Sequence, residues 1–161
     1  MALEMQKSQI ELDKISAIKT IDSEIDTINH LKDSVKAENL TKALDFMQNS
    51  KGRIIITGMG KSGHIGRKMA ATFASTGTPS FFLHPGEASH GDLGMITPND
   101  TVVAISNSGE SKELSDILVY CRRFGVPLVA ITKNPESSLG KNSDYVLKLP
   151  ANREACPLGL A

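Results

Sequence analysis

One glycine-rich stretch of the sequence contains the residue types that bind a phosphate group. Its residues are Gly58-Met59-Gly60-Lys61-Ser62-Gly63-His64-Ile65-Gly66. It follows an apolar run, Arg53 to Thr57, whose β-branched residues are typical of a buried strand, and it precedes an amphipathic run that indicates a helix. Glycines let backbone N–H groups and a helix N-terminus approach an anion, while Lys61 and Ser62 add a charge and a hydroxyl. The stretch therefore predicts a site for a phosphorylated ligand.

A P-loop is one alternative for this stretch. It requires a glycine five residues before the Gly-Lys-Ser triplet, and that position is Ile55, in the middle of the expected strand. The sequence therefore excludes a P-loop nucleoside triphosphatase. A tight turn that only packs the helix on the strand is a second alternative, and it accounts for the glycines but not for Lys61 and Ser62.

A dinucleotide site is a third alternative. Gly58, Gly60 and Gly63 match the G-x-G-x-x-G pattern, but such a site also needs an acid at the end of the next strand. The next expected strand ends near Leu83-His84, where no carboxylate stands, and Glu87 follows a few residues later. A Rossmann cofactor therefore stays open, while a phosphate bound without a nucleotide fits the residues better.

A second polar loop, Ser106-Asn107-Ser108-Gly109-Glu110-Ser111, follows another expected strand. Three serine hydroxyls and an asparagine at a helix N-terminus supply neutral donors to a phosphate dianion, and the helix dipole assists them. Ligands of open α/β sheets bind outside the carboxyl ends of the strands, so we expect this loop and the turn Gly60–Gly63 to face one crevice. The alternative is that Ser111 only caps its helix and the other residues form a turn.

The elements that must position these loops form an alternating pattern of strands and helices. The expected strands are Arg53–Thr57, Ser80–Leu83, Thr101–Ile105, Leu128–Thr132 and Tyr145–Leu149. The expected helices are Ser8–Leu31, Val35–Gln48, His64–Thr76 and Lys112–Phe124, with Gly52, Gly77 and Gly125 at the ends of the last three. This alternation predicts an α/β fold, a doubly wound five-stranded parallel sheet that is flavodoxin-like or Rossmann-like, with two preceding helices.

The first helix is long for a chain of this size and carries an apolar stripe. The stripe consists of Leu12, Ile15, Ile18, Ile21, Ile25, Ile28 and Leu31. A stripe of this kind belongs either to the core or to a contact between copies of the chain, and both bury the same face. We expect one domain over residues 1–161, with N-terminal helices in 1–50 and the sheet core in 51–161.

Composition excludes several classes of function. The formal net charge of the 161 residues is zero, tryptophan is absent and 4% of the residues are aromatic, so we expect no nucleic-acid partner. Cys121 and Cys156 lack metal-ligand spacing, and the N-terminus resembles neither a signal peptide nor a spanning helix. We therefore expect a cytoplasmic protein that does not bind a membrane.

Four segments together resemble the sugar isomerase (SIS) domain and, within it, the D-arabinose 5-phosphate isomerases. They are Gly58–Gly66, His84–Met95, Ile105–Ser111 and Glu154–Ala161. The resemblance implies an aldose–ketose isomerase that interconverts D-ribulose 5-phosphate and D-arabinose 5-phosphate through an enediolate, for lipopolysaccharide and Kdo biosynthesis. It also implies a homotetramer. The alternatives are a non-catalytic sugar-phosphate sensor on the same fold and a phosphoheptose-type isomerase.

The resemblance also implies roles for individual residues. Lys61, Glu113, Glu154 and His90 would be catalytic-site positions, with His90 beside the sugar. Glu113 would be the base if burial lifts its pKa toward neutrality, and Lys61 would stabilise the enediolate oxygen. The plainer alternatives are that Glu113 interacts with a helix dipole, that Glu154 is a surface acid and that Lys61 only holds the phosphate.

The remaining implied contacts are with the substrate. The substrate-binding positions are Gly60, Ser62, Gly77, Thr78, His84, His90, Ser106, Asn107, Ser108 and Ser111. His84 and His90 flank Glu87, and these three potential ligands could hold zinc, with His84 the metal contact that the resemblance implies. Because the reaction needs only proton transfers, we expect no required cofactor, and any zinc would be incidental or inhibitory.

The sequence also departs from the family pattern. Many of these isomerases carry a pair of CBS domains, and they continue beyond the position of Ala161 through a serine- and threonine-rich turn, a long helix and a further histidine. We therefore expect this polypeptide to be a C-terminally truncated SIS domain. The helix that would follow is expected to cover one sheet face and to complete the active site.

Overall fold

The computed structural model describes residues 2–35, 38–151 and 155–156, which divide into two compact units. The first unit comprises residues 1–33 and 150–161, and the second comprises residues 34–149. Each unit is considered by itself. Glu154, one of the expected catalytic residues, lies outside the described residues.

The first unit contains most of helix α1, Ala2–Val35, which extends the expected helix at both ends. The large apolar side chains of α1 remain between 38% and 60% exposed, and they are Ile10, Leu12, Ile15, Ile18, Ile21, Ile25, Ile28, Leu31 and Val35. The unit therefore leaves its own apolar stripe uncovered. None of the helices in the described part of the chain is long and apolar enough to cross a membrane.

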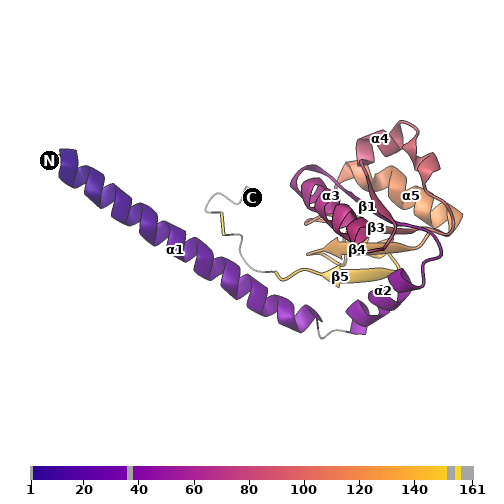
Figure 1. Cartoon of the computed structure of the whole chain (residues 1–161), viewed down its shortest axis with the longest axis horizontal. Coiled ribbons are helices and arrows are strands. Elements are labelled where there is room, and N and C mark those ends of the chain that lie inside the picture. Colours follow the sequence, from indigo (N-terminus) through magenta and orange to yellow (C-terminus); the bar gives the residue numbers. More distant parts are fainter. Residues whose placement is uncertain (1, 36–37, 152–154, 157–161) are drawn as a thin grey trace. The chain divides into compact units, whose positions relative to one another are not determined.

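The second unit is built on a five-stranded parallel sheet of order β2-β1-β3-β4-β5 (Figure 1). Its strands are β1 Ile54–Gly58, β2 Ser80–Leu83, β3 Thr101–Ile105, β4 Leu128–Thr132 and β5 Tyr145–Lys148. All five expected strands are confirmed; β1 is shifted by one residue and β5 ends one residue early. From β1 the chain adds β2 on one side of the sheet, and it then adds β3, β4 and β5 on the other side. The strand order therefore reverses between β1 and β3.

Helices cover both faces of the sheet because neighbouring strand residues point to opposite sides. Ile54 and Ile56 pack with Ala70 of α3, Gly60–Ser75, and with Ala43 of α2, Glu38–Gln48. Helix α3 contacts β1 and β2, whereas α2 contacts β5, beside which it lies in Figure 1. Helices α2 and α3 therefore form one of the two helical layers that the doubly wound prediction requires.

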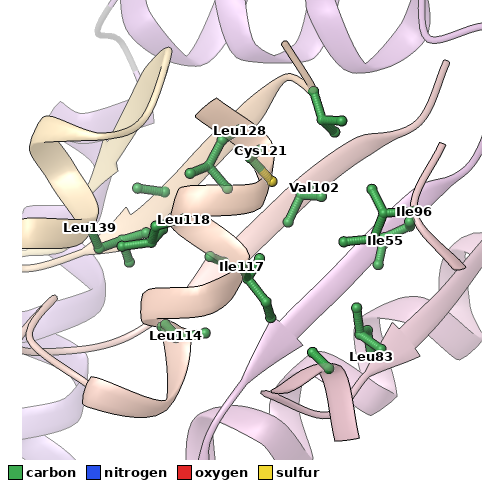
Figure 2. Close-up of a cluster of buried hydrophobic side chains, with 14 residues drawn as sticks. Ile55, Leu83, Ile96, Val102, Leu114, Ile117, Leu118, Cys121, Leu128 and Leu139 are labelled. Atoms are coloured by element: carbon green, nitrogen blue, oxygen red, sulfur yellow. The ribbon is translucent and has the colours of Figure 1, made fainter. Parts of the chain in front are cut away.

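Helices α4, Pro85–Ser89, and α5, Ser115–Phe124, cover the opposite face. Figure 2 shows Ile117 and Cys121 of α5 directed at Val102 and Ile55 of the central strands. The side chains of this cluster are almost fully buried, and each large one contributes about 1.5–3 kcal/mol on burial. Helix α5 ends at Gly125, whose φ of 62° is the expected left-handed cap.

Several short elements escaped the sequence prediction. They are α4, α6 at Ser138–Lys141, and the 3₁₀ turns η1 at Asp92–Met95 and η2 at Lys112–Leu114. A segment of one turn shows no hydrophobic period, so the pattern that reveals longer helices is absent. The expected helix Lys112–Phe124 accordingly begins as η2 and becomes α5 only at Ser115.

The amino-terminal end of the sheet is closed by a buried ion pair. Asp100 precedes β3 and is 1% exposed; its carboxylate accepts hydrogen bonds from Arg53 N, Nε and Nη2 at 2.7, 3.2 and 3.0 Å, and from Thr97 N and Oγ1 at 2.8 and 2.9 Å. Burial opposes ionisation of this carboxyl, but the hydrogen bonds from Arg53 and Thr97 outweigh it and lower the pKa of Asp100 to about 2.

Gly52 serves this ion pair rather than a helix cap, which corrects the sequence prediction. The described residues with positive φ are Gly60, Gly77, Gly91, Gly109 and Gly125, so Gly52 is not left-handed. A Cβ on Gly52 would stand 2.5 Å from Asp100 Oδ1 and 2.7 Å from the Asn99 backbone. Glycine is needed there because the chain passes so close to the carboxylate.

Candidate functional site

The carboxyl ends of β1 and β3 meet where the winding of the sheet reverses, the usual ligand position in such folds. Gly58 is in register with Ile105 at this point. A Cβ on Gly58 would stand 3.0 Å from the Ile105 carbonyl oxygen, so the two strand ends are held at close approach. The glycine-rich segment after β1 and the serine loop after β3, residues 106–111, therefore begin side by side, as expected.

Helix α3 begins at Gly60, four residues earlier than the expected start at His64. The expected turn Gly60–Gly63 is thus the first turn of a helix, and Gly60 takes a φ of +56° to enter it. Met59 is the N-cap residue, and a methionine side chain has no oxygen to satisfy the first helical N–H groups. Lys61 lies exposed and Ser62 half-buried beside this helix end, which favours an anion.

The serine loop is internally bonded. Ser106 is 3% exposed, and its Oγ accepts from Gly109 N at 3.1 Å and lies 2.9 Å from Ser111 Oγ. Ser108 Oγ accepts from Glu110 N at 3.2 Å. Asn107 and Ser108 are exposed at the tip. Ser106 thus fixes the loop from inside, while the next two residues present polar groups to solvent.

The alternative that Ser111 only caps a helix does not hold in the described part of the chain. Ser111 precedes η2, but its side chain makes no capping bond to that turn and instead contacts Ser106 Oγ. Ser106 and Ser111 are therefore linked through their hydroxyls, whereas the Ser108 hydroxyl accepts from Glu110 N.

The expected catalytic residues lie after neighbouring strands. Lys61 follows β1, His90 follows β2 at the end of α4, and Glu113 follows β3 within η2. All three side chains are exposed. Glu113 would act as a base if burial raised its pKa, but the described residues do not bury it. The roles of all three residues therefore stay predictions.

His84 is half-buried and makes structural contacts. Its Nδ1 accepts from Gly86 N at 3.2 Å at the start of α4, and its ring meets Phe82 edge-on with centroids 6.4 Å apart. No three His, Cys, Asp or Glu side chains among residues 2–35, 38–151 and 155–156 gather as a metal centre. The expected His84, Glu87 and His90 ligand set is therefore not formed there, and one nitrogen of His84 already caps α4.

Gly77 and Thr78 lie elsewhere. They form the turn between α3 and β2, with Gly77 at a φ of +97° and Thr78 N donating to Phe73 O at 2.9 Å. Because this turn precedes β2 in a parallel sheet, it stands at the amino-terminal end of that strand. The structure thus does not bring these two predicted substrate contacts to the crevice.

Glu110 has a role in the site that sequence reasoning missed. Its carboxylate accepts from Ser138 N at 2.8 Å and from Ser138 Oγ at 2.6 Å. The side-chain hydrogen bond from Ser138, followed by the backbone one, lowers the pKa of Glu110. The partners are 28 residues apart, so local spacing held no signal for this contact.

Comparison with known proteins decides the family. Residues 46–161, more than half of the chain, match the family model described as the SIS domain. The chain belongs to the SIS domain family. The resemblance expected from the sequence is confirmed, and so is the fold.

Named relatives of this SIS domain are isomerases. The arabinose 5-phosphate isomerase KdsD of Francisella tularensis is 55% identical over 149 residues, which cover 91% of this chain and 45% of the relative. The protein of the same name from Escherichia coli is 60% identical over 124 residues, covering 77% and 38%. The SIS domain described here thus spans less than half the length of these curated relatives.

A solved structure also resembles this SIS domain closely. An Escherichia coli protein in complex with arabinose 5-phosphate superimposes with a TM-score of 0.81 at 38% sequence identity, over 96% of this chain and 80% of that one.

Proposed function

We propose that this chain is the sugar-phosphate-binding part of an arabinose 5-phosphate isomerase. It would interconvert D-ribulose 5-phosphate and D-arabinose 5-phosphate in the cytoplasm and supply lipopolysaccharide and Kdo biosynthesis. The observation that carries the proposal is the 55% and 60% identity to curated relatives of that name. A solved homologue with arabinose 5-phosphate bound supports the choice of ligand.

The geometry supports a division of roles at the crevice. The serine loop and the N-terminus of α3 would bind the phosphate through hydroxyl and backbone donors. Lys61, in the first turn of α3, would stabilise the enediolate oxygen, and Glu113 or Glu154 would move the carbon-bound proton, with His90 beside the sugar. Proton transfers suffice for this chemistry, so we propose no cofactor.

Deuterium exchange is the test of this proposal. The chain is incubated with D-arabinose 5-phosphate in deuterium oxide, and NMR follows deuterium entering at carbon 2 of the aldose or carbon 1 of the ketose. Exchange is detected even when net turnover is slow, because each enediolate returns a solvent deuteron. Because a following helix is expected to complete the active site, we expect slow but detectable exchange with this chain and at least a hundredfold less with Lys61→Ala.

Titration calorimetry with the same sugar phosphate separates the alternatives. Binding without exchange would identify a sensor, and neither binding nor exchange would overturn the proposal. Faster exchange with a seven-carbon ketose phosphate than with the five-carbon one would identify a phosphoheptose-type isomerase instead.

We also propose that the chain forms a homotetramer through α1. Ile18, Ile21, Ile25 and Ile28 recur at the three-and-four spacing of a coiled coil and are between 51% and 60% exposed. Isoleucine at both inward positions favours more than two helices. Light scattering at micromolar concentration should give a tetramer, the double change Ile21→Glu and Ile25→Glu a smaller species, and the matched surface change Lys19→Glu no difference. A monomeric parent chain would contradict this proposal.

A further inference from the structure

Glu110 joins two loops that the chain forms far apart. It lies in the serine loop after β3, and Ser138, which donates both hydrogen bonds to its carboxylate, begins α6 after β4. The Glu110 side chain is exposed, so the pairing is not forced by burial. The carboxylate is instead held on two donors of one residue, and charge-assisted bonds of this kind are about twice as strong as neutral ones.

Further hydrogen bonds connect the serine loop to the segment that contains Ser138, residues 132–140, which is called the support below. Asn107 O accepts from Lys133 N at 3.1 Å and from Thr132 Oγ1 at 3.3 Å, and Gly109 O accepts from Leu139 N at 3.0 Å. These bonds use the carbonyl oxygens of the loop. Asn107 and Ser108 themselves remain exposed.

The support is itself tightly built around Ser137, which is fully buried. Ser137 Oγ donates to Asn134 O at 2.6 Å and accepts from Gly140 N at 3.2 Å. Gly109 packs against Ser137 with a φ of +73°, and a Cβ on Gly109 would collide with Ser137 Oγ. The serine loop therefore rests on a surface that has little room to shift.

We propose that Glu110 is a positioning residue that clamps the serine loop onto segment 132–140 and so holds Asn107 and Ser108 ready for the phosphate. This inference rests on the proposed function. An acid so close to an expected phosphate site would repel a dianion if it faced the ligand. Here the carboxylate instead accepts two hydrogen bonds from Ser138, so its charge strengthens the contact between the two loops.

The test compares Glu110→Ala with Glu110→Gln, which keeps an acceptor for Ser138 N. Titration calorimetry measures the affinity of the chain for inorganic phosphate and for D-arabinose 5-phosphate. Glu110→Ala should weaken both affinities by about three- to tenfold, up to the loss of one charge-assisted hydrogen bond, while Glu110→Gln should stay within about twofold. In exchange kinetics KM should rise and the rate at saturation should stay within about twofold, because the clamp acts on binding.

Two controls locate the effect. Glu136→Ala removes an exposed acid of the same support whose partner is Lys141 at 3.6 Å, and it should leave both affinities unchanged. Adding Ser138→Ala to Glu110→Ala should cause no further loss, because the two changes break the same contact.

Hydrogen exchange separates failure of the clamp from failure of the proposed function. In the unliganded chain the amides of Gly109 and Leu139, which donate to Ser106 Oγ and Gly109 O, should exchange faster in Glu110→Ala than in the parent, and Glu110→Gln should restore protection. This readout holds even if no sugar phosphate binds. Unchanged exchange of these amides together with unchanged phosphate affinity in Glu110→Ala would overturn the inference, as would a lowered melting temperature with neither of them changed.

Discussion

The two carboxylates that flank β3, Asp100 and Glu110, differ in burial and in the structures that they hold together. Asp100, before the strand, is 1% exposed and accepts five hydrogen bonds from Arg53 and Thr97. Glu110, after the strand, is exposed, and its carboxylate accepts hydrogen bonds from Ser138 N and Oγ. One strand therefore has the buried Asp100 carboxylate with its partners Arg53 and Thr97, called the lock from here on, at its amino-terminal end, and an exposed loop at its carboxyl end.

The difference shows how a parallel sheet separates stability from binding. At the amino-terminal end the polar groups are paired with each other, so changes there should alter the free energy of unfolding. At the carboxyl end the serine loop and the N-terminus of α3 lie where ligands of open sheets bind, so changes there should alter ligand affinity or turnover. Each prediction below tests one side of this separation, from the largest expected effect to the smallest.

Asp100→Ala should have the largest effect, on stability. It leaves Arg53 N and the Thr97 donors without their acceptor, and we expect a loss of about 3–4 kcal/mol in the free energy of unfolding, measured by urea denaturation. Glu38→Ala, which breaks an exposed pair with Lys42 at 2.8 Å, is the control and should leave the free energy of unfolding nearly unchanged. A loss below about 1 kcal/mol in Asp100→Ala would show that the hydrogen bonds of Asp100 do not determine the stability of the sheet.

Lys61→Ala should affect the opposite end and leave stability alone. If Lys61 acts on the developing oxyanion, its removal costs about 3 kcal/mol of barrier, or roughly a hundredfold or more in turnover. The unfolding free energy should change by less than about 0.5 kcal/mol, because Lys61 is exposed. An unchanged turnover with only a raised KM would reassign Lys61 to the phosphate.

The layout of the sheet was predictable from local patterns, whereas its long-range contacts were not. Runs such as Ile54–Gly58 have the β-branched density of buried strands, and the alternation with helices implies a parallel sheet. The pairing of Arg53 with Asp100 spans 47 residues, and no spacing rule encodes which side chains meet across two strands. The lock could therefore be found only in the folded chain.

The site was predictable in kind but not in detail. The serine loop and the glycine-rich segment were found from residue types, yet the start of α3 at Gly60 was missed because glycines lower helix propensity. Gly77 and Thr78 lie in the turn before β2, at the amino-terminal end of that strand, and their substrate contacts stay predictions. The contact of Glu110 with Ser138 was not predicted, because the two residues lie 28 positions apart and no local pattern links them.

Acid should weaken the lock in a defined range of pH. The pKa of Asp100 is lowered to about 2 in the folded chain, against about 3.9 when unfolded, so its contribution is complete above pH 4 and is lost as the pH falls through 2. That contribution is about 2 kcal/mol. Urea denaturation at several pH values should show this decline, and Asp100→Asn should flatten it. A parent and variant with parallel pH profiles would show that other groups cause the acid sensitivity.

The smallest expected effect is that of Ser108→Ala at the tip of the serine loop. Ser108 is exposed and its Oγ accepts from Glu110 N, which leaves the hydroxyl hydrogen to donate to a phosphate. Losing that bond should weaken sugar-phosphate affinity by about 1–2 kcal/mol, five- to thirtyfold, with no change in unfolding free energy. Ser106→Ala is the matched comparison, because Ser106 is buried and holds Gly109 N, and it should lower both affinity and stability. Equal losses of stability in the two variants would mean that the loop is folded as one unit with the core, and the separation between the two ends of the sheet would then fail at the carboxyl end.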